Sequence, residues 1–189
     1  MGLGLTLIRA RRHADDRGWF QETYSPARLR ALGLDHDFIQ DNESLSRRAG
    51  TVRGLHFQRP PQAQAKLVRC LAGAIFDVAV DLRRGSPTFG RAVSATLEGA
   101  SGDQLYVPVG FAHGFMTLTP DAVVAYKVSA PYAPDSEGGL AWDDPALALD
   151  WPEAGESVLS DRDRQWPRLS GIAPPFDYDG RPMALEIVS

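Results

Sequence analysis

The sequence is poor in the features that mark several protein classes. Cysteine occurs once, as Cys70, which excludes an intrachain disulfide and a cysteine-based zinc site. The apolar neighbours of Cys70 in KLVRCLAG predict a small buried hydrophobic residue. No run of about 18 apolar residues occurs, so we expect no membrane-spanning helix. The start, MGLGLTLIRARRHADDRG, has too short an apolar stretch, with its basic residues on the wrong side, for a secretory signal. We therefore expect a cytoplasmic protein.

Charge of one sign is also missing. The chain has 20 basic and 24 acidic residues, interspersed along it, and a formal net charge of -4. This distribution offers no basic face for a nucleic-acid backbone, so nucleic acid is not an expected partner, although a few local Arg and Lys side chains can still bind a small anion. With 189 residues, 43% hydrophobic and 23% charged, the chain has the size and balance of one globular domain, which we expect to span residues 1–189.

Glycine and proline are plentiful and spread along the whole chain, with 18 and 14 residues respectively. Between about residues 50 and 130 they separate short segments of strand-like length and alternation: AKLVRCLAG, AIFDVAVDLR, RAVSATLEG, LYVPVGFAHGFMTL and AVVAYKVSA. Many strands without an intervening helical period indicate a mainly β fold, a sandwich or closed barrel of the jelly-roll type. One short peripheral helix is expected in SPARLRALGL, with Ser25 as its cap and Gly33 at its end.

After about residue 135 the chain is rich in turn residues, tryptophan and clustered acids. A compact domain seldom keeps a long irregular segment unless that segment packs against something or shapes a site. We therefore expect the segment from 135 onward to contact the β-domain. To its last part, residues 171–189, we assign no chemical role.

Two of the four histidines stand in apolar surroundings. His13 and His36 have polar neighbours and are expected at the surface, whereas His56 in GLHFQ and His113 in GFAHGF are flanked by large apolar residues. Either one alone is as readily a packed histidine bonded to the backbone. Together in one small β-barrel, they indicate a site.

A metal centre is disfavoured by the ligand count. The stretch PVGFAHGF resembles the second motif of the cupin superfamily, whose histidine is a metal ligand in many members. Metal-binding cupins draw further ligands from an earlier strand with two histidines and a glutamate. Here that strand reads GLHFQRPPQ, with His56 alone and Gln58 in the place of the second histidine. Two imidazoles fall short of the three protein ligands of a catalytic metal site, so we expect a cupin-like barrel without metal.

Protein groups must then supply the chemistry. A histidine titrates near neutrality and can act as a general base when a carboxylate orients it; Asp163 in LSDRD is a candidate partner, although an Asp in a charged loop is usually only solvated. Lys66 begins an apolar strand, where a cation is costly unless it faces an anion or a developing oxyanion. Tyr126 lies inside VVAYKV, where a tyrosine is more often part of the core.

A series of long runs follows in order along residues 15–167: DDRGWFQE, QDNESLS, RGLHFQRPPQAQAKLVRCLAG, IFDVAVDLRRGSPTFG, LYVPVGFAHGF, YKVSAPYAPDSEGGLAWDDP and LSDRDRQWP. In order and spacing these runs resemble the dTDP-4-dehydrorhamnose 3,5-epimerase family. The resemblance implies a cupin jelly roll without metal or cofactor, a homodimer, that acts on dTDP-4-dehydro-6-deoxy-D-glucose in dTDP-L-rhamnose biosynthesis.

The resemblance also implies roles for individual residues. His56 matches the catalytic base, Asp163 its partner and Tyr126 the proton donor, while Lys66 and His113 match contacts beside the sugar ketone. Tyr132 matches an aromatic residue that stacks on thymine. The other positions that match substrate contacts are Arg17, Glu22, Gln40, Asp41, Asn42, Arg53, Glu137 and Arg162. We expect Arg17, Arg53 and Arg162 to serve the diphosphate, because guanidinium matches phosphate oxygens, and Glu22 and residues 40–42 to serve the nucleoside.

The sequence leaves two alternatives and one difficulty open. The same motifs fit a 3-epimerase, or a 3,5-epimerase of another nucleotide-linked ketosugar, and a non-catalytic sugar-binding cupin would share the fold. The difficulty is that Arg53 and His56 would face opposite sides of a regular strand, since side chains alternate with period two. We predict a bulge at Gly54 that turns both toward the cavity.

Overall fold

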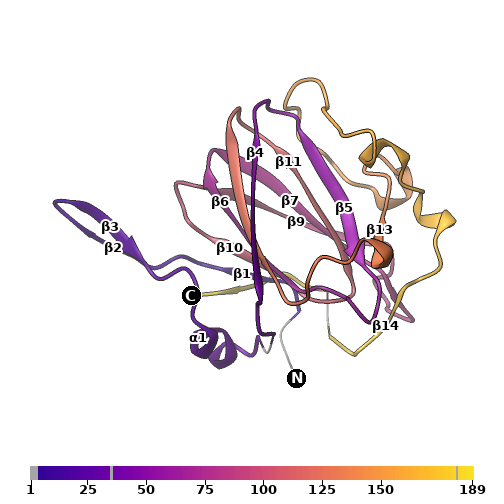
Figure 1. Cartoon of the computed structure of the whole chain (residues 1–189), viewed down its shortest axis with the longest axis horizontal. Helices are drawn as coiled ribbons and strands as arrows, with labels where there is room; N and C mark the ends of the chain where they lie inside the picture. Colours follow the sequence, from indigo (N-terminus) through magenta and orange to yellow (C-terminus); the bar gives the residue numbers. More distant parts are fainter. Residues whose placement is uncertain (1–3, 35, 182) are drawn as a thin grey trace.

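The computed structural model describes residues 4–34, 36–181 and 183–189. Two β-sheets face each other (Figure 1). The first has six strands in the order β15 (Glu186–Val188), β1 (Thr6–Ile8), β10 (Gln104–Val107), β6 (Lys66–Ala72), β12 (Ala122–Val128) and β4 (Gln40–Ser46). The second has five, in the order β13 (Glu137–Gly139), β5 (Val52–Gln58), β11 (Phe111–Thr117), β7 (Ala74–Asp81) and β9 (Ala92–Glu98). The mainly β, jelly-roll fold predicted from the sequence is confirmed.

Strand β7 shows how alternation builds the core. Ile75 and Ala79 point between the sheets, into a cluster that also holds Cys70. Val78 and Val80, one residue out of phase, point to the other face and pack with Leu55 in a second cluster. Both faces of the five-stranded sheet are therefore buried, which explains why β7 reads as a nearly continuous apolar run. Cys70 is 2% exposed, as its neighbours predict.

The irregular segment after residue 135 covers the outer face of the five-stranded sheet. Leu140, Leu147 and Phe176 are buried against that face. The segment contains four short 3₁₀ turns, η1 (Pro134–Ser136), η2 (Pro145–Leu147), η3 (Asp163–Gln165) and η4 (Leu169–Gly171), and a strand, β14 (Phe176–Asp177), that pairs with β8 (Arg83–Arg84). The expectation that this segment packs on the β-domain is confirmed. The final strand, β15, pairs with β1, so part of 171–189 has a structural role.

Helix α1 (Pro26–Ala31) begins as the sequence predicts. The backbone N–H of Arg28 donates to the Ser25 hydroxyl at 3.4 Å, and Gly33 follows the helix with a φ of +78°. The helix carries Leu29 onto the outer face of the six-stranded sheet, where it joins a cluster with Leu67. In the part of the chain that the structure describes, no helix is long and apolar enough to cross a membrane.

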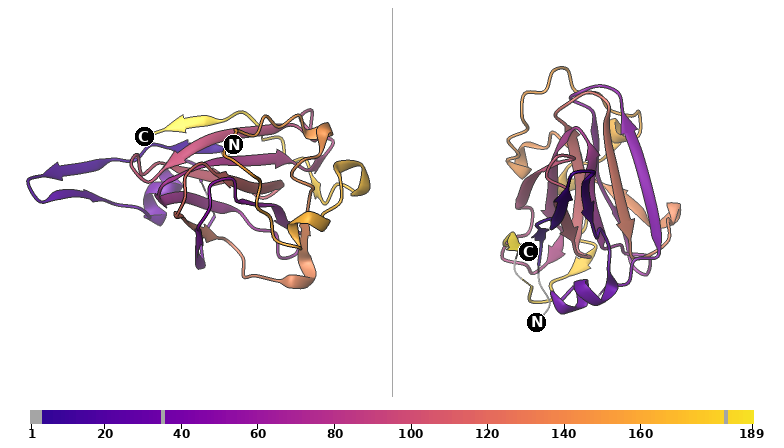
Figure 2. Two further views of the ribbon diagram at one scale, coloured as in Figure 1. Left: turned by 90° about the horizontal axis from the view of Figure 1, so that it is seen from above. Right: turned by 90° about the vertical axis from the view of Figure 1, so that its left-hand side faces the viewer.

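A two-stranded hairpin projects from the body of the molecule (Figures 1 and 2). It consists of β2 (Arg12–Asp15) and β3 (Gly18–Gln21), which pair with each other and form a sheet of their own. Trp19 and Phe20 are 59% and 70% exposed on it. His13 is exposed on the same hairpin, as predicted. The surface prediction for His36 is wrong: His36 is half-buried, and its Nδ1 lies 2.6 Å from the hydroxyl oxygen of buried Tyr106.

The bulge predicted at Gly54 is present. His56 of β5 is opposite His113 of β11, and Arg53 is opposite Phe115, so Gly54 and Leu55 together face Gly114 alone. The extra residue rotates the strand between the two ends of this stretch. Arg53 and His56 consequently both line the same cavity.

We expect Gly54→Ala to destabilise the protein by about 2–5 kcal/mol, through positive-φ strain and a clash. Gly54 has a φ of +126°, and a Cβ there would lie 2.6 Å from the Cα of Gly114. Gly18→Ala is the matched control, because Gly18 has a φ of +130° but open space around it. Urea denaturation of both variants measures the difference. Equal destabilisation would show that the close approach of the two strands contributes nothing.

Candidate active site

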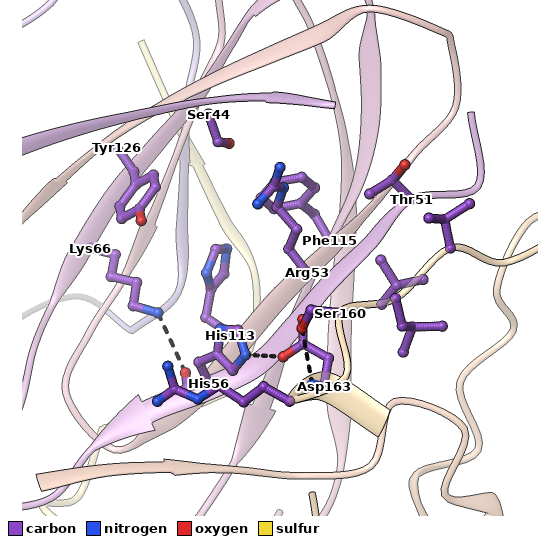
Figure 3. Close-up of a pocket in the computed structure, with 14 residues that line it drawn as sticks. Ser44, Thr51, Arg53, His56, Lys66, His113, Phe115, Tyr126, Ser160 and Asp163 are labelled. Carbon is purple, nitrogen blue, oxygen red and sulfur yellow. Dashed lines mark hydrogen bonds and ion pairs between the residues drawn. The ribbon is translucent and has the colours of Figure 1, made fainter. Parts of the chain in front are cut away.

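A cavity of about 420 Å³ lies between the two sheets, and strands β4 and β5 both contribute to its lining. Figure 3 shows the side chains that converge on it. They come from strands of both sheets, from the irregular segment before η3 and from Asp163, the first residue of η3. The lining residues are Ser44, Thr51, Val52, Arg53, His56, Lys66, His113, Phe115, Tyr126, Val158, Leu159, Ser160, Arg162 and Asp163. The structure thus brings together seven of the residues singled out from the sequence as catalytic or substrate-binding: Arg53, His56, Lys66, His113, Tyr126, Arg162 and Asp163.

His56 and Asp163 form a pair although 107 positions separate them. The Nε2 of His56 lies 2.5 Å from the Oδ1 of Asp163. Burial opposes ionisation of Asp163, but hydrogen bonds from His56, Ser160 and Trp166 outweigh it and lower the pKa of the carboxyl group. An ionised Asp163 only accepts hydrogen bonds, so Nε2 of His56 carries its proton and Nδ1 is the nitrogen free to take another.

A second His–Asp pair lies deeper in the cavity. The Nε2 of His113 is 2.9 and 3.1 Å from the two carboxylate oxygens of Asp77, a residue with no exposed surface. Burial and the nearby Lys66 lower the pKa of His113 despite the opposing effect of Asp77. His113 is therefore neutral at pH 7. Asp77 was missed from the sequence, where the signal was the presence of two Asp residues, Asp77 and Asp81, in the otherwise apolar AIFDVAVDL.

Lys66 and Tyr126 have pKa values that suit them to opposite tasks. Burial lowers the pKa of Lys66 to about 8, with the charge of Asp77 opposing the shift. The Lys66 ammonium lies 3.4 Å from the carbonyl oxygen of His56 and is still protonated at pH 7. Burial raises the pKa of Tyr126, although Arg53 opposes this, so the phenol keeps its proton and can donate it.

A chain of polar contacts extends from the cavity along its rim. Arg162 forms an ion pair with Glu137, which accepts a 2.9 Å hydrogen bond from the hydroxyl of Tyr132. The backbone N–H of Tyr132 donates to Gln40 at 3.4 Å, and the Gln40 amide donates to Asn42 at 2.8 Å. Four of the residues expected to contact substrate therefore lie outside the cavity lining but are joined to it through Arg162.

Three expected substrate residues do not reach the cavity within one chain. Arg17, at the tip of the projecting hairpin, has an 89% exposed side chain and pairs with Asp15. Glu22 is exposed at the base of that hairpin. Asp41 points to the outer face of β4, because alternation sets it opposite to Gln40 and Asn42, and its carboxylate lies 2.6 Å from the Lys127 ammonium.

The residues of the cavity can move protons and hold an anion. Two histidines, each fixed by a carboxylate, a cationic lysine and a protonated phenol serve acid–base chemistry beside an oxyanion, and two arginines serve phosphate. Among the residues that the structure describes, no group of three or more His, Cys, Asp or Glu side chains could hold a metal ion.

Comparison with known proteins agrees with this chemistry. The family model described as dTDP-4-dehydrorhamnose 3,5-epimerase matches residues 3–171. The chain belongs to this family. A dTDP-4-dehydrorhamnose 3,5-epimerase from Sinorhizobium fredii is 54% identical over 172 residues, which cover 91% of this chain and 88% of the relative.

Solved structures of the family have the same fold. A dTDP-4-dehydrorhamnose 3,5-epimerase from Bacillus anthracis, crystallised with TDP and PPi bound, is 49% identical with a TM-score of 0.84, covering 86% of this chain and 93% of that one. A dTDP-6-deoxy-D-glucose-3,5-epimerase from Legionella pneumophila, in complex with dTDP-4-keto-L-rhamnose, is 44% identical with a TM-score of 0.87, covering 92% and 93%. The resemblance noted in the sequence and the cupin-like fold are both confirmed.

Proposed function

We propose that this member of the family epimerises C3 and C5 of dTDP-4-dehydro-6-deoxy-D-glucose to give dTDP-4-dehydro-L-rhamnose, in dTDP-L-rhamnose biosynthesis. The main support for this proposal is the placement of the acid and the base. A histidine base on β5 and a protonated tyrosine on β12 approach the cavity from opposite sheets, with Lys66 between them (Figure 3). Inversion of a carbon needs a base on one face of the substrate and a proton donor on the other.

Each epimerisation is a balanced exchange of protons. Nδ1 of His56 takes the proton from C3 and the C–H electron pair delocalises onto the C4 oxygen, giving an enolate. The Lys66 cation stabilises that negative charge. Tyr126, or water, then returns a proton to C3 from the opposite face. Solvent takes the proton from His56 and reprotonates Tyr126, and the same steps then follow at C5. No electrons are transferred, so we propose no cofactor.

The charged end of the substrate fits the arginines of the cavity. Arg53 is held by hydrogen bonds of 3.1 Å to the Ser46 hydroxyl and to the Leu45 carbonyl, which leaves part of its guanidinium for a phosphate. Arg162, which lines the cavity and pairs with Glu137 on its rim, supplies a second guanidinium. We assign the diphosphate to these two side chains and the thymine to Tyr132, which is 54% exposed.

Deuterium counting tests this function. With dTDP-4-dehydro-6-deoxyglucose in D₂O, we expect one deuterium at C3 and one at C5 of the product, read by mass spectrometry and NMR. Deuterium at C3 alone would identify a 3-epimerase, and none at either carbon would identify a binding protein. A His56→Ala sample run in parallel separates enzymatic exchange from spontaneous exchange next to the ketone.

We also propose that the protein acts as a homodimer in the cytoplasm. The projecting hairpin carries Arg17 together with exposed Trp19 and Phe20, and Arg17 is not among the residues that line the cavity of its own chain. A second copy that covers Trp19 and Phe20 would both bury these aromatic rings and receive Arg17 at its diphosphate site. The cytoplasmic assignment follows from the substrate, a charged nucleotide sugar that does not cross membranes unaided.

Mixing inactive variants tests the dimer. We expect Arg17→Ala and His56→Ala homodimers each to be impaired, and their co-expressed heterodimer to recover about a quarter to a half of wild-type activity, because one of its sites then has both residues intact. Size-exclusion chromatography with light scattering gives the oligomeric state. A fully active monomer, or no recovery in a purified heterodimer, would contradict this arrangement.

A further inference from the structure

The inner face of β4 carries a row of small polar side chains. Asn42, Ser44 and Ser46 alternate with exposed residues and point into the space between the sheets. Asn42 accepts a hydrogen bond from Gln40, and Ser46 accepts one from Arg53. Ser44 lies between them and lines the cavity. Unlike its two neighbours it has no hydrogen-bond partner: among the described residues, its Oγ is the one buried side-chain nitrogen or oxygen atom that lacks one.

An unpaired buried hydroxyl is a cost to the free protein. Leaving such a group unsatisfied is unfavourable, whereas an alanine of nearly the same shape carries no such penalty. The hydroxyl is therefore not explained by stability. A group of this kind beside a ligand cavity is accounted for when the ligand supplies the missing partner.

The register of β4 fixes what lies on either side of Ser44. Two residues along the strand, Ser46 holds the Arg53 guanidinium. Two residues in the other direction, Asn42 is opposite Tyr126 of β12. Ser44 thus lies about 7 Å from each of these positions, between the arginine assigned to phosphate and the tyrosine assigned to the reacting carbons. In the view of Figure 3, Ser44 is drawn between Tyr126 and Arg53, and all three side chains line the cavity.

We propose that the Ser44 hydroxyl binds the sugar of the substrate, through a hydrogen bond to a sugar oxygen on the ring edge nearest the diphosphate. This inference rests on the proposed function, because it takes the diphosphate to lie at Arg53 and the ketone at Lys66. Ser44 is then a substrate-binding residue that discriminates between nucleotide sugars by the oxygen they present to β4.

The test is the behaviour of Ser44→Ala in activity, affinity and stability together. We expect KM to rise about tenfold with kcat within twofold of wild type, because one uniform hydrogen bond to substrate is lost. The affinity for dTDP, measured by calorimetry, should stay within twofold, since dTDP has no sugar beyond its phosphates. The melting temperature should be unchanged or higher, because an unpaired hydroxyl has been removed.

Two further variants sharpen the result. Ser44→Cys keeps the shape but loses the strong hydrogen bond and should show the KM of the alanine variant. Ser94→Ala, at an exposed position of β9 outside the cavity, should behave as wild type. A wild-type KM in Ser44→Ala, an equal loss of dTDP affinity, or a lower melting temperature would each overturn the proposal. Failure of the proposed function is distinct, because wild type itself would then exchange no deuterium at C3 or C5.

Discussion

His56→Ala should lower kcat by about 10³-fold while leaving dTDP affinity within a few-fold of wild type. The imidazole is the base for both carbons in the proposed mechanism, and the nearest alternative, His113, is neutral but fixed by Asp77 in the depth of the cavity. Asp163→Asn should cost about 10²-fold, because an amide no longer selects the tautomer that leaves Nδ1 unprotonated. Single-turnover deuterium exchange at C3 and C5 measures the proton transfer itself.

The control for this pair is His36→Ala. It removes a half-buried imidazole that is hydrogen-bonded to Tyr106 and lies outside the cavity, so kcat should stay within about threefold even if the melting temperature falls. Added imidazole should restore part of the activity of His56→Ala by entering the vacated space. A His56→Ala variant that retains a tenth of wild-type exchange at either carbon would assign the base to another group.

The fold was predictable from the sequence because its causes are local. Turn residues such as those of RPPQ separate strands whose alternation is visible in the sequence, and β5, β6, β7, β9, β11 and β12 follow that pattern. The helix was predictable from Ser25 and Gly33 for the same reason. Even the bulge could be predicted, since glycine between Arg53 and His56 was the one local way to turn both toward the cavity.

The partners within the site were less accessible, because they depend on contacts between distant segments. His56 and Asp163 are 107 positions apart, and His113 and Asp77 are 36 apart. The first pair was predicted from a family resemblance, and the second was missed. Ser44 was missed because QDNESLS is too polar to suggest a strand with a buried face; β4 is recognisable only once β12 pairs with it. The proposed role of Arg17 rests on a second copy of the chain, and contacts between two copies leave no pattern within one sequence.

Lys66→Met should lower kcat/KM by about 10²–10³-fold at pH 7, because the enolate oxygen loses its cationic partner in a site with little water. Methionine keeps the length and apolar contacts of the lysine stem. The wild-type enzyme should also lose kcat/KM as pH rises through about 8, the pKa to which burial lowers Lys66, since the active form carries the proton. The residual activity of Lys66→Met should lack this limb. Steady-state profiles from pH 6 to 10 measure both effects.

The pH dependence of protein stability gives an independent check on Lys66, because it runs in the opposite direction to the pH dependence of activity. The pKa of Lys66 falls from 10.5 to about 8 on folding, so between these values the unfolded chain binds more protons than the folded one. The contribution of Lys66 to the free energy of unfolding therefore rises with pH across that interval. Below about pH 8 the full cost of burying the charged lysine applies. Lys66→Met should be more stable than wild type at pH 7, and this advantage should shrink toward pH 10.5. If Lys66→Met is less stable than wild type at pH 7 and equally active, the role of Lys66 is packing. We expect the opposite, greater stability together with lost activity, because the cation serves to stabilise the enolate.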